Sequence, residues 1–182
     1  MDLFLNEFSG SKDYQICCTL AYDKNLLELR YSIEANDIKN VFQSTDGPKK
    51  LVASTDLWKK NCLEAFFFDT KSTAYFELNF NPDGEYALLN FESYRKASSQ
   101  ELKIEIFAIK TSISNNTLSS SLTMTISEKA NFLFSPTAII YPKGSNPLYF
   151  ALNHGKSPDF HALETVKTHC PKLGFTLPNF GL

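Results

Sequence analysis

Hydrophobic and polar residues alternate along most of this chain, and the alternation is clearest between residues 62 and 95. Apolar, aromatic-rich runs at 62–69 and 74–80 are followed by an Asn-Pro-Asp-Gly tetrad at 81–84 and a third run at 85–95. Proline fixes φ for a turn, aspartate can bond its own backbone, and glycine takes the positive φ that closes the turn. The pattern predicts three antiparallel strands with a hairpin at the tetrad.

Similar alternation predicts strands on both sides of this central group. They are expected at 14–22, 26–33, 37–42, 51–53, 101–113, 118–126, 131–134, 137–141 and 148–152, with Pro136 interrupting the apolar stretch between 131 and 141. Helix is expected only as a single turn near 55–58 and as one or two turns at 162–169. About ten short strands separated by turns predict an all-β, antiparallel β-sandwich with little helix. The sequence has no repeat, low-complexity tract or linker, so residues 1–182 are expected to form one domain.

Two of the central strands carry polar side chains on one face. With a side-chain period of two, Glu77 and Asn79 share a face of the strand at 74–80, opposite Phe76 and Leu78. Glu64 occupies an equivalent position on the preceding strand, so antiparallel pairing should bring it close to Glu77 or Asn79. Two carboxylates on one face repel each other unless something compensates.

The expected compensating group is Arg95, which follows Tyr94 at the end of the third strand. Trp58 is expected near the mouth of the same cluster. A polar cluster ringed by aromatic residues is typical of a concavity that binds a polar ligand. Two other interpretations stay open: Glu77 and Asn79 lie on a solvated sheet face, or the acids and Arg95 form a buried network that fixes strand register.

The composition is that of a folded protein with aromatic-rich strands. The chain is 43% hydrophobic and 14% aromatic, with 16 Phe and 8 Tyr, which favours pleated, half-buried surfaces. A net charge of −2 argues against nucleic-acid binding, which needs a basic patch. No leader-like or membrane-spanning segment is recognisable, so a cytoplasmic protein without a membrane partner is expected. The four cysteines (Cys17, Cys18, Cys62 and Cys170) show no metal-binding spacing, and no metal site is expected.

The sequence contains no motif that announces an enzyme. GxGxxG, the P-loop, HExxH and GxSxG are all absent, although Glu64 and Glu77 could form a glycosidase pair. The loop near the C-terminus contains His154, Asp159 and His161. Asp159 could orient a histidine through Nδ1, or the loop could be held by backbone hydrogen bonds instead.

Four segments, in order, carry a resemblance to a known family. Residues 57–64 (LWKKNCLE) are similar to LWxxTCFE, 75–84 (YFELNFNPDG) to YWEFNFSPSG, 91–95 (FESYR) to FxxYR, and 149–161 (YFALNHGKSPDFH) to a YWALxH…PDFH segment. Together they resemble the bacterial DOMON-like proteins, which are related to the family nine carbohydrate-binding modules. The sequence departs from that pattern where Phe76, Tyr86 and Phe150 replace tryptophan and Asn81 replaces serine.

The resemblance implies a jelly-roll β-sandwich and a sugar- or haem-binding function. We therefore predict a non-catalytic module that binds a small polar ligand, with a carbohydrate favoured, in a cleft formed by the central strands. The resemblance and the polar cluster together select the ligand-binding candidates: Trp58, Glu64, Glu77, Asn79, Tyr94, Arg95, His154, Asp159 and His161. Of these, Trp58 and Tyr94 would stack on the sugar. The alternatives are a haem site with His154 and Met124 as axial ligands, or a purely structural cluster.

Overall fold

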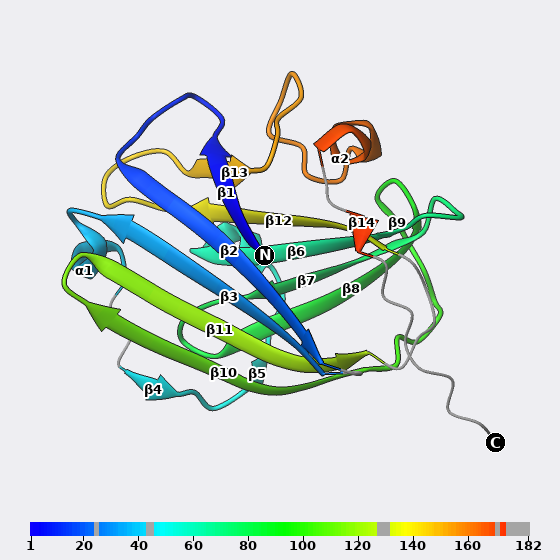
Figure 1. The fold of residues 1–182 in the computed structure, drawn as a ribbon, viewed down its shortest axis with the longest axis horizontal. Helices are drawn as coiled ribbons and strands as arrows, with labels where there is room; N and C mark the ends of the chain where they lie inside the picture. Colours follow the sequence, from blue (N-terminus) through cyan, green and yellow to red (C-terminus); the bar gives the residue numbers. More distant parts are fainter. Residues whose placement is uncertain (24–25, 43–45, 127–131, 170–171, 174–182) are drawn as a thin grey trace.

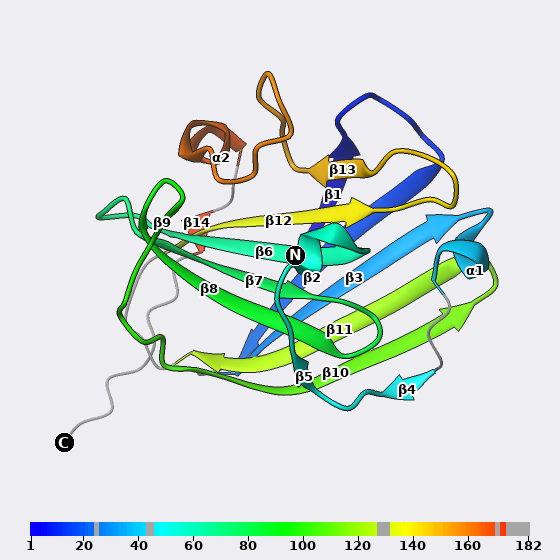
Figure 2. The ribbon, with the colours of Figure 1, turned by 180° about the vertical axis from the view of Figure 1, so that it is seen from behind.

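Two β-sheets pack face to face in the computed structural model of the protein (Figures 1 and 2), which describes residues 1–23, 26–42, 46–126, 132–169 and 172–173. The first sheet has the order β4 (Gly47–Pro48), β10 (Ile104–Ser114), β11 (Thr117–Ile126), β3 (Leu26–Ala35), β2 (Tyr14–Asp23) and β1 (Asp2–Glu7). The second continues from β1 through β13 (Leu148–Ala151), β12 (Phe132–Ile140), β6 (Cys62–Asp69), β7 (Tyr75–Phe80), β8 (Glu85–Ser93) and β5 (Val52–Ala53). Two short strands lie off this path: β9 (Lys96–Ala97) pairs with β8 and β14 (Lys172–Leu173) with β12.

Strand β1 belongs to both sheets. Its first part, up to Leu5, pairs with β2 of the first sheet, and Asn6 and Glu7 pair with β13 of the second. The strand pairs in the described residues are antiparallel except for β5 and β8, which are parallel. The predicted all-β antiparallel sandwich is therefore confirmed.

The core between the sheets follows the predicted alternation. From the first sheet, Leu29 and Tyr31 point inward and are fully buried, and from the second Phe67, Leu78 and Phe80 do the same. Alternate residues of the second sheet point to its other, outer face, which is therefore available to a site. Burying large apolar side chains contributes about 1.5–3 kcal/mol each, so this alternation fixes which face is inward.

The predicted edge strand at 37–42 is wrong, because residues Ile38–Val41 form a short helix, α1. Ile38 and Phe42 are both buried, and the backbone N–H of Phe42 donates to the carbonyl of Ile38. Apolar residues four apart lie on one face of a helix, and they also lie on one face of a strand. Periodicity over so short a segment does not separate the two structures.

The predicted break at Pro136 is also wrong, since β12 runs through it. Pro136 pairs with Ala65 of β6, and on its other side β12 changes neighbour: β14 pairs at Phe132 and Leu133, and β13 pairs from Thr137 onward. A residue without an N–H is tolerated where a ladder changes partner in this way. Residue 131, where the first of the two predicted segments began, lies outside the described residues.

The third central strand ends earlier than predicted. β8 stops at Ser93, and Arg95 adopts a left-handed φ of 52° in the tight turn that leads to β9. At the other end of β8, Gly84 closes the predicted hairpin turn with φ 97°, and an added Cβ would collide with the backbone of Lys50. Both ends of β8 are thus fixed by special backbone geometry.

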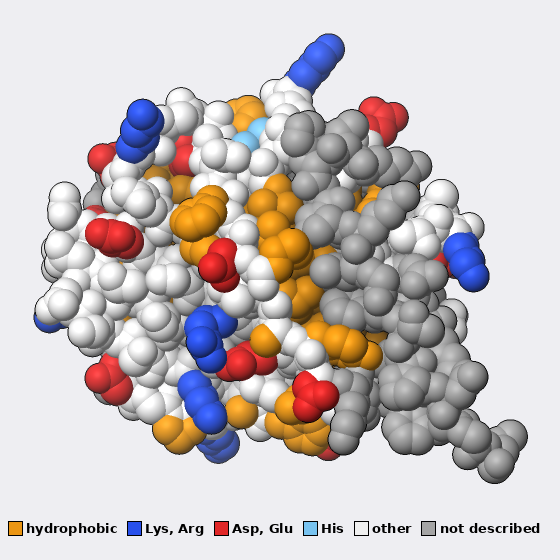
Figure 3. Space-filling model, viewed as in Figure 1, with side chains coloured by type: hydrophobic (Ala, Val, Ile, Leu, Met, Phe, Trp, Pro, Cys, Tyr) orange, Lys and Arg blue, Asp and Glu red, His pale blue; other side chains and the backbone are white. Residues whose placement is uncertain are grey.

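The helical content is small, as predicted. A 3-10 turn, η1 (Leu57–Lys59), precedes β6, and helix α2 (Leu163–His169) follows the loop after β13. Within the described residues, no helix combines the length and apolarity needed to cross a membrane. Figure 3 shows acidic and basic side chains interspersed over one face rather than gathered into a basic stripe. Cys170 lies outside the described residues.

Candidate functional site

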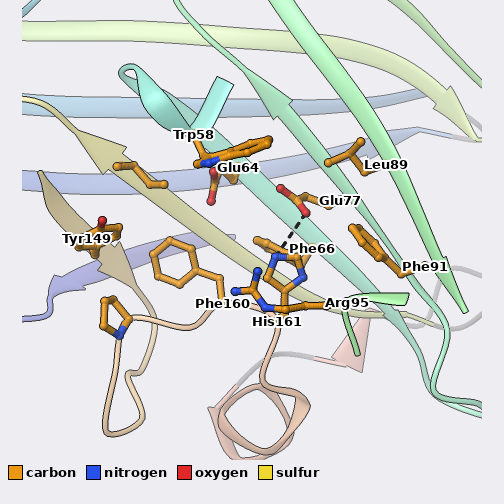
Figure 4. A pocket seen from close by; sticks show the side chains of 12 residues that line it. Trp58, Glu64, Phe66, Glu77, Leu89, Phe91, Arg95, Tyr149, Phe160 and His161 are labelled. Carbon is orange, nitrogen blue, oxygen red and sulfur yellow. Dashed lines mark ion pairs between the residues drawn. The ribbon is translucent and has the colours of Figure 1, made fainter. Parts of the chain in front are cut away.

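A pocket of about 330 Å³ opens on the outer face of the second sheet (Figure 4), and we call it the outer pocket. Its apolar wall is mainly aromatic: Trp58, Phe66, Phe91, Tyr149 and Phe160. Its ionisable lining residues are Glu64, Glu77, Arg95 and His161. They come from η1, from strands β6, β7, β8 and β13, from the turn after β8 and from the loop before α2, so segments far apart in sequence build one cavity.

Strand register brings the two glutamates together. Glu64 of β6 lies opposite Asn79 of β7, and Glu77 lies opposite Phe66. Both carboxylates therefore lie on the outer face of the sheet, diagonal to one another across a strand pair. The predicted proximity of Glu64 to Glu77 and Asn79 follows directly from the antiparallel pairing.

Glu64 lies at the floor of the outer pocket and is almost fully buried, with 2% of its surface exposed. Its Oε2 accepts a hydrogen bond of 3.0 Å from the hydroxyl of Thr137 on β12. Burial raises the pKa of this carboxyl to about 8, and the nearby charge of Glu77 adds to the increase. Glu64 is therefore a buried acid that holds its proton at neutral pH in the free protein.

Glu77 is also buried, with 4% of its surface exposed, and only one of its two carboxylate oxygens has a hydrogen-bond partner among the described residues. Its Oε1 accepts a 2.6 Å hydrogen bond from the amide Nδ2 of Asn79. Its Oε2 has no hydrogen-bond partner among the described residues and lies 3.7 Å from Nε2 of His161. Burial raises the pKa of Glu77 as well. A buried polar atom without a partner is uncommon in folded proteins and indicates a place where a further group can bind.

His161 is held in a defined orientation by Tyr75. The backbone N–H of Arg95 donates to the Tyr75 hydroxyl at 3.1 Å, and that hydroxyl lies 2.7 Å from His161 Nδ1. The Tyr75 hydroxyl thus joins the turn after β8 to the His161 ring. Burial, helped by the charge of Arg95, lowers the pKa of His161 to about 4, so the ring is neutral at physiological pH, with its Nε2 on the side of Glu77.

Asp159 does not orient a histidine ring, so that interpretation of the loop is wrong. Its carboxylate accepts hydrogen bonds from the backbone N–H of His161 (3.1 Å), the hydroxyl of Tyr94 (2.6 Å) and Nη2 of Arg95 (3.1 Å). The loop is thus held through backbone and side-chain contacts to the turn after β8. These hydrogen bonds outweigh partial burial and lower the pKa of Asp159.

Arg95 is not the direct partner of the two glutamates that the sequence suggested. Its guanidinium pairs with Asp159, 64 residues further along the chain. Arg95 still lines the outer pocket, and its charge partly offsets the increase in the pKa of Glu77. Arg95 lies in the left-handed turn beyond the end of β8, where its side chain reaches the loop of Asp159.

Trp58 stands at the edge of the outer pocket with 44% of its surface exposed. Its backbone carbonyl accepts a 2.7 Å hydrogen bond from the hydroxyl of Tyr141, which anchors the turn η1 to β12's end. Lys59 Nζ lies 5.6 Å from the indole centroid and also pairs with Asp56. The turn that carries Trp58 is therefore anchored, and the indole itself is partly exposed at the edge of the pocket.

Four predicted site residues do not line the outer pocket, and one of them is Asp159, which binds the turn after β8 as described above. Asn79 is fully buried behind Glu77, and Tyr94 is 58% exposed with its hydroxyl bound to Asp159. His154 lines a second, much smaller cavity, where its Nε2 lies 2.7 Å from the backbone oxygen of Asn6. Met124, its suggested haem partner, is fully buried in the core between the sheets. His154 and Met124 therefore do not face a common cavity.

The sequence reasoning missed much of the aromatic wall. Phe91, Tyr149 and Phe160 line the outer pocket, yet none was among the candidates. All three lie within the segments that carried the family resemblance, at 91–95 and 149–161. The signal was present, but alternation alone assigns an aromatic residue to either face of a strand.

The comparisons with known proteins match structures and not sequences. No protein-family model and no curated protein sequence matches the chain. Among solved structures, a Bacteroides uniformis protein inferred to bind carbohydrate matches with TM-score 0.57 and 15% identity, covering 91% of this chain and 83% of its own. A family nine carbohydrate-binding module from Caldicellulosiruptor kristjanssonii matches in complex with cellotriose (TM-score 0.54, 9% identity, 86% and 74% covered) and with glucose (0.55, 8%, 85% and 76%).

These matches define the class of fold. At such low identity they show that the chain shares a β-sandwich architecture with family nine modules over most of its length.

Proposed function

We propose that the protein is a non-catalytic module that binds a small carbohydrate in the outer pocket. The observation that carries the proposal is the meeting of an exposed indole, several aromatic rings and buried carboxylates in one cavity. Support comes from the fold, since the Caldicellulosiruptor module with the same architecture was solved with cellotriose and with glucose. Kinship with the DOMON-like proteins, supported by the four sequence segments, and a cytoplasmic location are part of the same proposal.

The chemistry of the lining suits a sugar. The C–H faces of a sugar ring stack on aromatic rings, and its hydroxyls need fixed donors and acceptors. The pocket volume of about 330 Å³ is near the lower end of the range for small-ligand sites, which favours one or two sugar units over a long chain.

Each functional group has an assigned role. Trp58 and Tyr149 provide faces for the sugar ring, and the unpartnered Oε2 of Glu77 accepts a hydrogen bond from the ligand. Arg95 donates from the rim while remaining paired with Asp159. Tyr94 stacks only on a ligand that extends beyond the pocket, because its ring is exposed at that side.

Isothermal titration calorimetry with a panel of mono- and disaccharides tests this function. Trp58→Ala should weaken the tightest sugar by about tenfold or more, since it removes the stacking face. Phe107→Ala is the matched control: Phe107 has similar exposure (49%) but lies on β10 of the first sheet. No heat with any sugar, or equal losses in the two variants, would contradict the proposal.

A further inference from the structure

The two glutamates of the outer pocket have no lysine or arginine partner among the residues that the structure describes. Among the described residues, no lysine or arginine forms an ion pair with Glu64 or Glu77. Glu77 Oε2 lies 3.7 Å from Nε2 of His161, whose ring is neutral at physiological pH. Two buried carboxylates at one site carry a high desolvation cost unless a positive charge joins them.

The cations near the pocket are already committed to other acids. Each of the three pairs closely with a different carboxylate: Lys59 with Asp56 (2.8 Å), Lys60 with Glu85 (2.8 Å) and Arg95 with Asp159 (3.1 Å). Among the described residues, an ionised Glu77 therefore has no cation within ion-pairing distance, and the charge of Arg95, itself paired with Asp159, offsets it only in part.

The walls of the outer pocket also suit a positive charge. Aromatic rings attract a cation over their faces, and the cavity is lined by Trp58, Tyr149, Phe160, Phe66 and Phe91. Figure 4 shows the carboxylates of Glu64 and Glu77 surrounded by these aromatic side chains, with Glu64 beside the indole of Trp58. An ammonium group placed there would meet acids below and aromatic faces at the sides.

We infer that the outer pocket selects sugars that carry a free amine over neutral sugars. The inference rests on the proposed function and specifies the class of sugar that the pocket binds. The ammonium group of an amino sugar donates to the unpartnered Oε2 of Glu77 and neutralises its charge, while the sugar ring stacks on Trp58. A charge-assisted hydrogen bond in a buried site is stronger than the bond a hydroxyl would make there.

Matched sugar pairs test the inference on the wild-type protein. Calorimetry at about pH 6.5, where amines are protonated, would compare glucosamine, galactosamine and mannosamine with their parent hexoses and with the N-acetyl derivatives. The amino sugar of at least one pair should bind about tenfold or more tightly than both neutral forms. Ethanolamine, which has the amine without the ring, separates recognition of the charge from recognition of the sugar.

A variant locates the preference. Glu77→Gln should weaken binding of the amino sugar about tenfold more than binding of its neutral parent, because glutamine has no charge to pair with the ammonium group. Glu105→Gln, at an exposed position on β10, should change neither. The wild-type comparison stands by itself if Glu77→Gln fails to fold.

The outcomes separate this inference from the proposed function. Neutral sugars that bind as tightly as their amino forms would overturn the inference and leave the carbohydrate function intact. Ethanolamine binding as tightly as the amino sugars would support charge recognition and overturn the carbohydrate function. Binding by no probe would overturn both.

Discussion

The buried carboxyl of Glu64 should make the stability of the protein fall as the pH rises. Burial moves its pKa from the ordinary 4.5 to about 8, so between these values the folded protein holds a proton that the unfolded chain has lost. The free energy of unfolding therefore decreases from pH 4.5 upward, and the loss is complete above pH 8. A pKa change of this size corresponds to at most about 5 kcal/mol.

His161 has the opposite effect at lower pH. Its pKa falls from 6.5 to about 4, so the unfolded chain binds the extra proton and stability decreases as the pH drops from 6.5 to 4. Between pH 4.5 and 6.5 the His161 contribution offsets part of the loss caused by Glu64 and by Glu77, whose pKa is also raised. The stability should therefore fall more steeply between pH 6.5 and 8, where His161 no longer compensates for Glu64.

Glu64→Gln tests this reasoning, because glutamine keeps the shape and the acceptor for Thr137 but cannot ionise. Urea unfolding at about pH 5 should give similar midpoints for wild type and variant. At about pH 8.5 the variant should be more stable, by at most about 2 M urea in the midpoint. Glu105→Gln, at an exposed position, is the control. Parallel profiles for wild type and Glu64→Gln across this range would refute the assignment of Glu64 as a buried, protonated acid.

Three further predictions concern the framework of the site. Gly84→Ala should lower the free energy of unfolding by about 2 kcal/mol or more, because the new Cβ would collide with the backbone of Lys50. Gly144→Ala, where a Cβ has open space, should lower it by about 1 kcal/mol. Urea unfolding of both variants checks this, and equal losses would contradict it. Asp159→Asn should speed amide hydrogen exchange at His161 by about tenfold, measurable by NMR, because it weakens the acceptor of that N–H. Ile38→Ala should cost about 2–4 kcal/mol in thermal or urea unfolding if α1 closes the core as described; a change below 1 kcal/mol, on the order of a surface substitution, would argue against that packing.

The fold was largely predictable because a buried sheet face leaves a strong period-two signal. Phe76, Leu78 and Phe80 point inward, and the register that follows places Glu64 beside β7 without any long-range information. The same signal failed at Ile38 and Phe42, where a four-residue spacing fits either a strand or a helical turn.

The site was predictable only in part because its connections are not periodic. The glutamates follow from alternation, but the partner of Arg95 depends on where a loop 64 residues later returns to the sheet. Tyr149 enters the outer pocket from β13, which pairs with both β1 and β12, and Phe160 enters from the loop that follows β13; no local pattern specifies the position of either. Tertiary geometry, not residue type, decided which candidates meet.

The division of β1 between the two sheets has a consequence for handling the protein. The first half of β1 pairs with β2 and its second half pairs with β13. Removing β1 would therefore expose the unpaired backbone groups of two strand edges, one in each sheet. Shortened versions that begin after Glu7 should therefore self-associate through those edges, and any fusion partner at the amino end needs a spacer that leaves the first residues free to pair.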